Sequence, residues 1–331
     1  MTDRERLIAT FLTRHGWGEA KRGKLAGDAS FRRYDRLVAP DGGRAVLMDA
    51  PPPREDVRPF MAIEAHLLAL GYSAPRLFAA DAQAGLLLLE DLGDETFTLL
   101  LAAGEREADL YRLAVDQLID LHGRGEAAVP RGLAPYDDER LLTEAFLLTD
   151  WYAPEMNPLP AGARDDYATL WRALFPTARA VPETLVLRDF HVDNLLRLAG
   201  RPGVAACGLL DFQDAVAGPI TYDLMSLLED ARRDIDPALI ATLRNHYLQA
   251  FPHLDRQAFD ASWAVLAAQR HAKVIGIFTR LCRRDGKPIY LRHIPRLWRL
   301  LERALAHPRL ADLKNWFDRY LPEGKRGVPL P

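Results

Sequence analysis

The stretch Val186-Leu187-Arg188-Asp189-Phe190-His191-Val192-Asp193-Asn194 decides how the rest of the chain is interpreted. An apolar run at residues 185–187 predicts a short buried strand that ends in this polar loop. A second apolar run follows at residues 195–198, and a third at residues 207–210 leads directly into Asp211-Phe212. Two acids and an amide are therefore expected at the ends of short strands, where a rigid frame can orient them.

Asp189 and Asn194 have the Asp-x-x-x-x-Asn spacing found in phosphoryl-transfer enzymes of the kinase type. This chemistry needs one carboxylate to orient the attacking hydroxyl and accept its proton, and it needs oxygen ligands for Mg²⁺. Asp189 suits the first role, and Asn194 and Asp211 suit the second. The spacing alone also fits ordinary turn residues, because Asp and Asn favour turns. The strand–loop–strand–Asp-Phe context favours the catalytic interpretation.

The composition is that of a globular protein with a substantial core. The chain has 331 residues, of which 49% are hydrophobic and 27% charged, with a net charge of −3. Nothing in this balance points to a nucleic-acid or membrane partner. Cys207 and Cys282 each lie in an apolar stretch, which favours two buried free thiols over a disulfide or a metal site. A charged N-terminus without a long apolar run predicts a cytoplasmic protein, in a compartment that supplies ATP.

The first part of the chain is predicted to be rich in strands. A small-residue turn at residues 25–34 predicts a β-hairpin, in which Gly27, Ala29 and Ser30 would let the backbone approach a phosphate, although an ordinary hairpin is the alternative. Pro59 is expected to open a helix that Gly71 closes. Further elements are expected as a helix at residues 4–15 and as strands at residues 44–48, 77–80 and 86–89.

Helices predominate after residue 92, where we place the boundary between two lobes. Residues 1–92 are expected to form a nucleotide-binding N-lobe, and residues 93–331 a C-lobe that carries the catalytic loop, the metal site and sugar-binding helices. The expected helices lie at residues 106–122, 135–152, 165–175, 222–233, 237–250, 262–283 and 295–306.

From about residue 25 to residue 233 the chain resembles the aminoglycoside phosphotransferase and choline kinase group. The most specific parts are residues 188–194, Leu210-Asp211-Phe212-Gln213-Asp214 and Pro219-Ile220-Thr221-Tyr222-Asp223-Leu224. The resemblance implies an α+β, bilobal protein-kinase-like fold, with a small antiparallel-sheet N-lobe and a larger, mainly helical C-lobe. It assigns the catalytic base to Asp189 and the Mg²⁺ ligands to Asn194 and Asp211.

The same resemblance implies where ATP binds. Glu90 to Leu92 would be the hinge whose backbone meets adenine, and Gly27-Asp28-Ala29-Ser30 would be the loop that covers the phosphates. Asp223 is expected to hold the metal loop from behind.

Within the group, the chain looks most similar to bacterial anomeric sugar kinases of cell-wall recycling. Those enzymes phosphorylate N-acetylmuramate and N-acetylglucosamine at C1. The stretches that carry this likeness are residues 27–34, Leu47-Met48-Asp49-Ala50-Pro51-Pro52 and residues 269–278. Such an enzyme is expected to bind ATP, Mg²⁺ and a small amino sugar and to work as a monomer.

Two departures from the family pattern stand out. The catalytic loop reads Leu187-Arg188-Asp189 where the family often has His-Gly-Asp. The third strand also offers no Lys to the phosphates, although Glu64 is a suitable helix partner for one. Arg32 or Arg33 on the adjacent strand could supply the positive charge, since Arg is a good phosphate ligand. The alternative is that both arginines are solvated strand residues.

The remaining candidates concern the acceptor. His191 and Asp193 could meet a sugar hydroxyl or brace the loop. Trp151 and Tyr152 could stack on a sugar ring or belong to the core.

Arg232 and Arg270 are candidate partners for a lactyl carboxylate. Acids mixed with arginines in the C-lobe favour a neutral or anionic acceptor. A kinase of another small alcohol or amine, such as an aminoglycoside, homoserine or choline, is the second hypothesis. A non-catalytic ATP-binding pseudokinase is the third.

Overall fold

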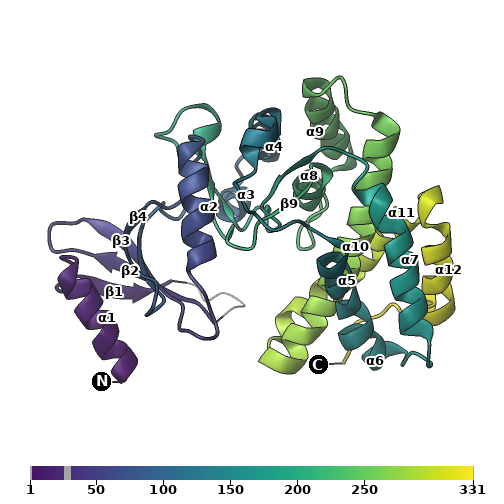
Figure 1. Ribbon diagram of the computed structural model, residues 1–331, viewed down its shortest axis with the longest axis horizontal. Coiled ribbons are helices and arrows are strands. Elements are labelled where there is room, and N and C mark those ends of the chain that lie inside the picture. The colour runs from purple at the N-terminus through teal and green to yellow at the C-terminus, as the bar shows by residue number, and fades with distance from the viewer. Residues whose placement is uncertain (1, 26–30, 331) are drawn as a thin grey trace. The chain divides into compact units, whose positions relative to one another are not determined.

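The computed structural model describes residues 2–25 and 31–330, and the chain divides into two compact units. Unit 1 comprises Met1–Gln117 and Val192–Ala215, and unit 2 comprises Leu118–His191 and Val216–Pro331. Figure 1 shows the sheet in the N-terminal part of the chain and the many helices of its C-terminal part. A division by contacts does not test a boundary between functional lobes, so the boundary at residue 92 stays a prediction.

Unit 1 is built on a five-stranded antiparallel sheet with the order β1-β2-β3-β5-β4. The central strands β3 and β5 are almost wholly buried. Alternate residues of the sheet, Leu37, Ala45 and Leu47 among them, pack against helix α1 in one core cluster. Val46 and Leu89 point to the opposite face, where they line a pocket. The strands are β1 (Lys21–Lys24), β2 (Arg33–Val38), β3 (Arg44–Asp49), β4 (Leu77–Asp81) and β5 (Leu86–Glu90).

The helices of unit 1 and a second hairpin complete this unit. As predicted, Pro59 lies in the first turn of α2, and Gly71 follows its end with a positive φ of 87°. The short hairpin β7–β8 follows the polar loop that contains Asn194. The elements are α1 (Asp3–Arg14), α2 (Arg58–Ala69), α3 (Phe97–Ala102), β7 (Leu195–Arg197) and β8 (Cys207–Leu209), and α4 (Glu107–Gly123) runs into unit 2.

Unit 2 is organised around α10 (Arg256–Asp285), a helix of 30 residues that packs against α5, α7, α8 and α11 (Figure 1). Most of its middle is buried on every side, which explains its run of Ala, Val, Leu and Ile. The other helices are α5 (Asp138–Leu147), α6 (Ala153–Met156), α7 (Ala163–Ala178), α8 (Thr221–Leu228), α9 (Pro237–Ala250), α11 (Ile294–Leu305) and α12 (Ala311–Tyr320). A two-stranded sheet joins β6 (Glu183–Val186) and β9 (Val216–Pro219).

Most predicted elements are present, but several helix bounds differ, such as the start of α10, which lies at Arg256 and not at residue 262. The helix expected at residues 135–152 changes into a π-helix at Leu148–Tyr152. The helix expected to reach residue 233 ends at Leu228, because Glu229 leaves the helical region with φ −118° and ψ 47°. The Asp230 carboxylate then accepts a hydrogen bond from the Arg232 backbone N–H at 2.6 Å, a local bond that competes with helix continuation.

Two further predictions concern the cysteines and the membrane. Both cysteines are free, as expected, but only Cys207 is buried and Cys282 is partly exposed. Among the described residues, none of the helices combines the length and the apolar character that crossing a bilayer requires.

The close approach of α10 to the end of α5 depends on Gly276. A Cβ atom at this position would lie 2.2 Å from the carbonyl carbon and oxygen of Leu147. We predict that Gly276→Ala destabilises the protein by about 3 kcal/mol, the upper end of the usual cost of overpacking, because the clash is with backbone. Gly123→Ala is the control, since a Cβ there meets nothing within 4 Å. Equal midpoints of thermal unfolding for the two variants would contradict this account.

Candidate active site

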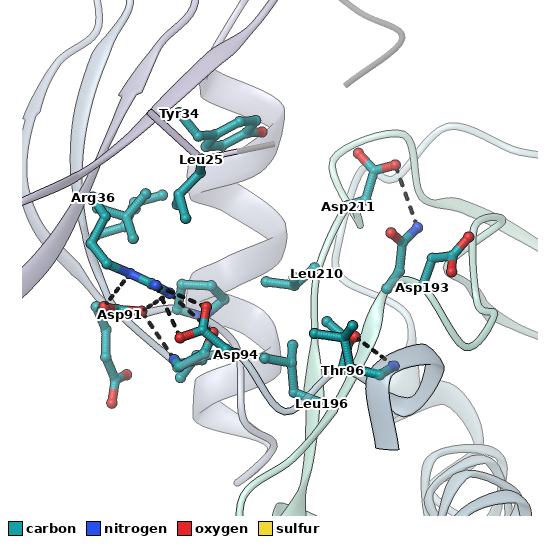
Figure 2. A pocket seen from close by; sticks show the side chains of 18 of the residues that line it. Leu25, Tyr34, Arg36, Asp91, Asp94, Thr96, Asp193, Leu196, Leu210 and Asp211 are labelled. Carbon is teal, nitrogen blue, oxygen red and sulfur yellow. Dashed lines mark hydrogen bonds and ion pairs between the residues drawn. The ribbon is translucent and has the colours of Figure 1, made fainter. Parts of the chain in front are cut away.

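Unit 1 contains a cavity of about 550 Å³ on the face of the sheet opposite α1. Such a volume is typical of a small-molecule site. Its walls combine apolar side chains from the sheet and from α2 with polar residues of two loops (Figure 2). The lining includes Leu25, Tyr34, Val46, Phe60, Leu89, Leu196 and Leu210, together with Asp193, Asn194 and Asp211.

The predicted hinge forms one rim of this cavity. Glu90 to Leu92 line it, as do Gly93 and Asp94. Arg36 on β2 donates hydrogen bonds to Asp91 and to Asp94, each at 3.0 Å. Figure 2 shows the Arg36 guanidinium between these carboxylates. The ion pairs hold the hinge beside the sheet. No sequence pattern predicts them, because Arg36 lies on β2 and Asp91 follows β5, 55 positions later.

The two predicted metal ligands are brought together by the register of the β7–β8 hairpin. Leu195 pairs with Leu209, and the Leu210 N–H donates to the Asn194 carbonyl at 2.9 Å. The side chains of Asn194 and Asp211 therefore lie side by side, with the Asn194 Nδ2 atom 3.5 Å from the Asp211 Oδ2 atom. Asp211 also has a φ of 58°, a left-handed conformation that is uncommon outside Gly.

This pair of side chains fits Mg²⁺. The ion prefers oxygen ligands and usually takes one or two from the protein, the rest coming from water and phosphates. Asp211 offers a carboxylate, and Asn194 offers its Oδ1 atom once the amide turns. Within the described residues, no group of three or more His, Cys, Asp or Glu side chains could hold a metal. A magnesium site with one or two protein ligands does not require such a group.

The two candidate arginines have different surroundings. Arg32 has a side chain only 10% exposed, and its Nη2 atom lies 3.4 Å from the Asp211 Oδ1 atom. Arg33 is 58% exposed and pairs with Asp49, which also accepts a hydrogen bond from Arg4 at 2.8 Å. The contacts therefore favour Arg32 as the cation near the metal and phosphate position. The predicted phosphate loop, Gly27, Asp28, Ala29 and Ser30, lies outside the described residues.

Within residues 2–25 and 31–330, no strand cation pairs with Glu64, although a kinase of the usual pattern would provide one. The Leu77 N–H of β4 donates to its carboxylate at 2.9 Å, which ties α2 to the edge of the sheet. Burial raises the pKa of Glu64, and the hydrogen bond from Leu77 acts in the opposite direction. Glu64 therefore has a structural contact here, while its predicted part in nucleotide binding stays untested.

The catalytic loop belongs to unit 2 and follows β6 directly. Arg188 has a φ of 69°, and its N–H donates to the Asp223 carboxylate at 3.0 Å, while the Leu187 N–H donates to the same carboxylate at 2.6 Å. Asp223 therefore holds the start of the loop that carries Asp189, while the expectation that it supports the metal loop stays a prediction. Burial raises the pKa of Asp223 to about 7, against the lowering effect of the two backbone hydrogen bonds.

Asp189 is half-buried and lies among positive charges. Burial by itself would raise the pKa of Asp189, but the charges of Arg270 and Lys273 outweigh it and lower the pKa. Arg270 is buried, and its Nη1 atom donates to the Arg188 carbonyl at 3.4 Å and to the Tyr222 hydroxyl at 3.3 Å. Asp189 is thus kept ionised, as a proton acceptor must be.

A buried charge cluster supports this loop, and the sequence analysis did not identify it. Glu144 on α5 forms ion pairs with Arg188 and, at 2.9 Å, with Lys273. It also accepts hydrogen bonds from the Tyr136 hydroxyl and, at 3.2 Å, from the Gln269 amide. Burial would raise the pKa of Glu144, but the two cations lower it to about 2.

The predicted acceptor residues fall into different environments. Asp193 lines the cavity of unit 1 and accepts a hydrogen bond from the Thr98 hydroxyl. In unit 2, His191 is buried and Arg232 is exposed. Trp151 is half-buried. The Tyr152 side chain is fully buried, and its hydroxyl donates to the Gly327 carbonyl at 2.7 Å, so its contacts favour a core role over stacking on a sugar.

The fold is that of the protein-kinase-like phosphotransferases. The family model described as "Phosphotransferase enzyme family" matches residues 23–260. The chain therefore belongs to this family of enzymes, and the expected fold class is confirmed.

Relatives over nearly the whole length carry one name. An N-acetylmuramate/N-acetylglucosamine kinase of Caulobacter vibrioides is 38% identical and covers 97% of this chain and 98% of its own. A protein of the same name from Pseudomonas aeruginosa is 39% identical, over 93% and 92% of the two chains. Among solved structures, a choline/ethanolamine kinase family protein from Mesorhizobium loti has a TM-score of 0.62 at 14% identity, over 95% and 98% of the chains. That likeness concerns the fold alone. Membership of a kinase family implies ATP as the donor and typically Mg²⁺.

Replacing Arg32 by Met tests its part in phosphate binding. We expect kcat/KM for ATP to fall by roughly 10- to 100-fold, the range for loss of a hydrogen bond to a charged group. Arg33→Met is the matched control, because Arg33 is exposed and Asp49 keeps its bond to Arg4. Steady-state kinetics with varied ATP decide the question. Equal kinetics of the two variants would exclude Arg32 from the phosphate site.

The Glu144 cluster should make stability depend on pH. Its pKa is lower in the folded protein, about 2 against an ordinary value near 4.5, so its stabilising contribution is complete above about pH 4.5 and is lost as the pH falls towards 2. Glu144→Gln should cost about 3–5 kcal/mol at neutral pH, because it leaves buried cations without a counter-charge. The variant should also lose less stability than the wild type on acidification.

Urea unfolding of the full-length protein at a series of pH values measures both the loss of stability at neutral pH and its dependence on pH. Glu155→Gln is the control, since Glu155 is a partly exposed acid paired with Arg283 and such pairs contribute about 0–1 kcal/mol. A Glu144 variant with the stability and the pH profile of the control would show that the cluster is not a stabilising one.

Proposed function

We propose that this enzyme transfers the γ-phosphoryl group of ATP to the anomeric C1 hydroxyl of N-acetylmuramate and N-acetylglucosamine. The observation that carries the proposal is the similarity of 38–39% over nearly the whole chain to proteins named N-acetylmuramate/N-acetylglucosamine kinase. These sugars are components of bacterial cell walls, which places the reaction in peptidoglycan recycling. Because the intact catalytic triplet Asp189, Asn194 and Asp211 accompanies that similarity, a non-catalytic module is not favoured.

Each half-site supplies a distinct part of the reaction. In unit 1, the hinge from Glu90 to Leu92 offers backbone groups to the adenine base, and Arg32 offers a guanidinium to the phosphates. Asn194 and Asp211 would hold Mg²⁺, which neutralises charge on the β- and γ-phosphates. In unit 2, the Asp189 carboxylate orients the acceptor hydroxyl and accepts its proton.

The lowered pKa of Asp189 supports an acidic acceptor hydroxyl. A carboxylate that the charges of Arg270 and Lys273 keep ionised is a weak base. The anomeric hydroxyl is more acidic than the other hydroxyls of the sugar, because the ring oxygen withdraws electron density. A single weak base therefore suffices for transfer at C1, whereas an ordinary alcohol would ask more of it.

The structure separates the two arginines suggested for the lactyl carboxylate of N-acetylmuramate. Arg232 is exposed, with its guanidinium 5.7 Å from the centre of the Phe278 ring, and it stays the candidate for contact with an anionic acceptor. Arg270 is buried against Tyr222 and the Arg188 carbonyl, which supports a role in positioning the catalytic loop. We further propose that the enzyme acts as a monomer in the cytoplasm, where ATP is available.

The product of the reaction tests the proposal. A C1 phosphate blocks ring opening, so the phosphorylated sugar should no longer be a reducing sugar and should show phosphorus coupling to the anomeric proton by NMR. We predict this product from either sugar with ATP and Mg²⁺.

Asp189→Asn should reduce kcat by about 10²–10⁴-fold while ATP still binds, because an amide keeps the shape of the side chain but cannot accept the proton.

Three outcomes would count against parts of the proposal. A phosphorylated product that still reduces would place the phosphate on another hydroxyl. Absence of any phosphorylated sugar would favour a different small alcohol or amine as the acceptor. A near-normal kcat in Asp189→Asn would remove Asp189 from the role of base.

A further inference from the structure

Asp230 lies in the irregular segment that follows α8 and carries one carboxylate oxygen without a partner. The residue is only 1% exposed. Its Oδ1 atom accepts a hydrogen bond from the Arg232 N–H at 2.6 Å, and its backbone carbonyl accepts one from the Arg296 Nε atom at 2.8 Å. The Oδ2 atom is buried and has no hydrogen-bond partner among the described residues.

A buried carboxylate oxygen of this kind calls for a physical explanation. Most buried polar atoms in folded proteins are hydrogen-bonded, because a buried polar group without a hydrogen bond loses its contacts with water and gains none in exchange. The penalty is larger for a charged group. A segment that keeps such an oxygen next to functional residues is typical of a binding site whose ligand supplies the missing donor.

The segment of Asp230 and the catalytic loop both contact helix α10. The preceding residue, Glu229, accepts hydrogen bonds at 2.8 Å from the Trp263 Nε1 atom of α10 and pairs at 2.8 Å with the His271 Nε2 atom. Arg270, next to His271 on α10, donates to the Arg188 carbonyl. One turn of α10 therefore contacts both the segment of Asp230 and the loop of Asp189.

His191 shows the same proximity through its electrostatics. Burial lowers the pKa of His191 first, and the positive charges of Arg232 and Arg270 lower it further, while the negative charges of Asp230 and Asp189 oppose them. His191 thus lies within electrostatic reach of both acids. Asp230 and the proposed base Asp189 thus both act on His191, and all three residues belong to unit 2.

We propose that Asp230 is an acceptor-binding residue whose Oδ2 atom accepts a hydrogen bond from a hydroxyl or from the acetamido N–H of the sugar. The inference rests on the proposed amino-sugar kinase activity and adds a binding residue that the sequence patterns did not single out. Residues 229–236 form no helix or strand, so the carboxylate can turn towards an entering sugar without breaking an element. The expected partner of Asp230 is a hydrogen-bond donor that both sugars have, such as a ring hydroxyl or the acetamido N–H, and not the lactyl group.

The matched pair Asp230→Asn and Asp234→Asn tests this assignment in the full-length enzyme. Asp234 lies in the same segment, but its side chain is 78% exposed and pairs with Arg296. We expect Asp230→Asn to raise KM for N-acetylglucosamine and for N-acetylmuramate by roughly 10- to 100-fold, the range for a hydrogen bond to a charged group. KM for ATP should stay within about twofold, and Asp234→Asn should resemble the wild type.

Thermal unfolding separates binding from a structural role. Asp230→Asn should unfold at or above the wild-type temperature, because the amide removes an incompletely satisfied buried charge while its Oδ1 atom still accepts from Arg232. A variant with a lower unfolding temperature and an unchanged acceptor KM would overturn the inference, since the oxygen would then serve only the fold. Wild-type enzyme inactive on both sugars would overturn the proposed function, and this inference with it. Normal wild-type activity with an unaffected Asp230→Asn would overturn the inference alone.

Discussion

The Asp223 carboxylate fixes the backbone on which the catalytic half-site depends. It accepts hydrogen bonds from two successive N–H groups, those of Leu187 and Arg188, just where β6 ends. Arg188 lies there in a left-handed conformation that costs an L-residue roughly 1–2 kcal/mol. The two hydrogen bonds offset that cost and set the direction in which the chain continues into Asp189. Since Asp223 belongs to α8, whose residues are all buried, the support is rigid.

The turn also directs the Arg188 side chain into the protein, which creates an electrostatic problem that Glu144 solves. Arg188 and Lys273 bring two positive charges into a poorly solvated region, and their carboxylate partner carries only one negative charge. The charge of Arg270 contributes most to the lowered pKa of Asp189, and those of Lys273 and Arg188 add to it. The cluster therefore has a chemical consequence as well as a structural one, because both cations that pair with Glu144 also help to keep the base ionised.

The local motifs of this site could be predicted from sequence, whereas its long-range partners could not. Asp189, Asn194 and Asp211 lie next to strand ends that apolar runs mark, so their positions could be predicted from spacing and context, while their roles stay predictions. Glu144 lies on helix α5, 44 positions before Arg188 of the catalytic loop, and no periodicity links the two residues. Tyr152 is a further example. The sequence does not distinguish an aromatic residue that faces a ligand from one that packs in the core, and the Tyr152 hydroxyl donates to the Gly327 carbonyl.

The end of α8 was mispredicted for a related reason. Residues 222–233 contain enough apolar positions for a longer helix, but Glu229 is drawn to Trp263 and His271, and Asp230 bonds to the Arg232 N–H. Tertiary partners of two acids thus outweigh local helix propensity. The sequence alone does not show such partners, since they come from α10, and the irregular segment that results brings Asp230 near the catalytic loop.

The absence of a lysine on β3 has a coherent physical counterpart in unit 1. Val46 of that strand lines the cavity with an apolar side chain. The positive charge comes instead from Arg32, the residue just before β2, whose guanidinium lies 3.4 Å from the Asp211 carboxylate. Glu64, which in a kinase of the usual pattern would pair with the lysine, accepts the Leu77 N–H. Burial raises the pKa of Glu64, whereas a close cation would lower the pKa, and the described part of the chain places none there. The lack of a lysine on β3 is thus accompanied by two other differences. Glu64 on α2 bonds to the Leu77 N–H, and Arg32 provides the positive charge.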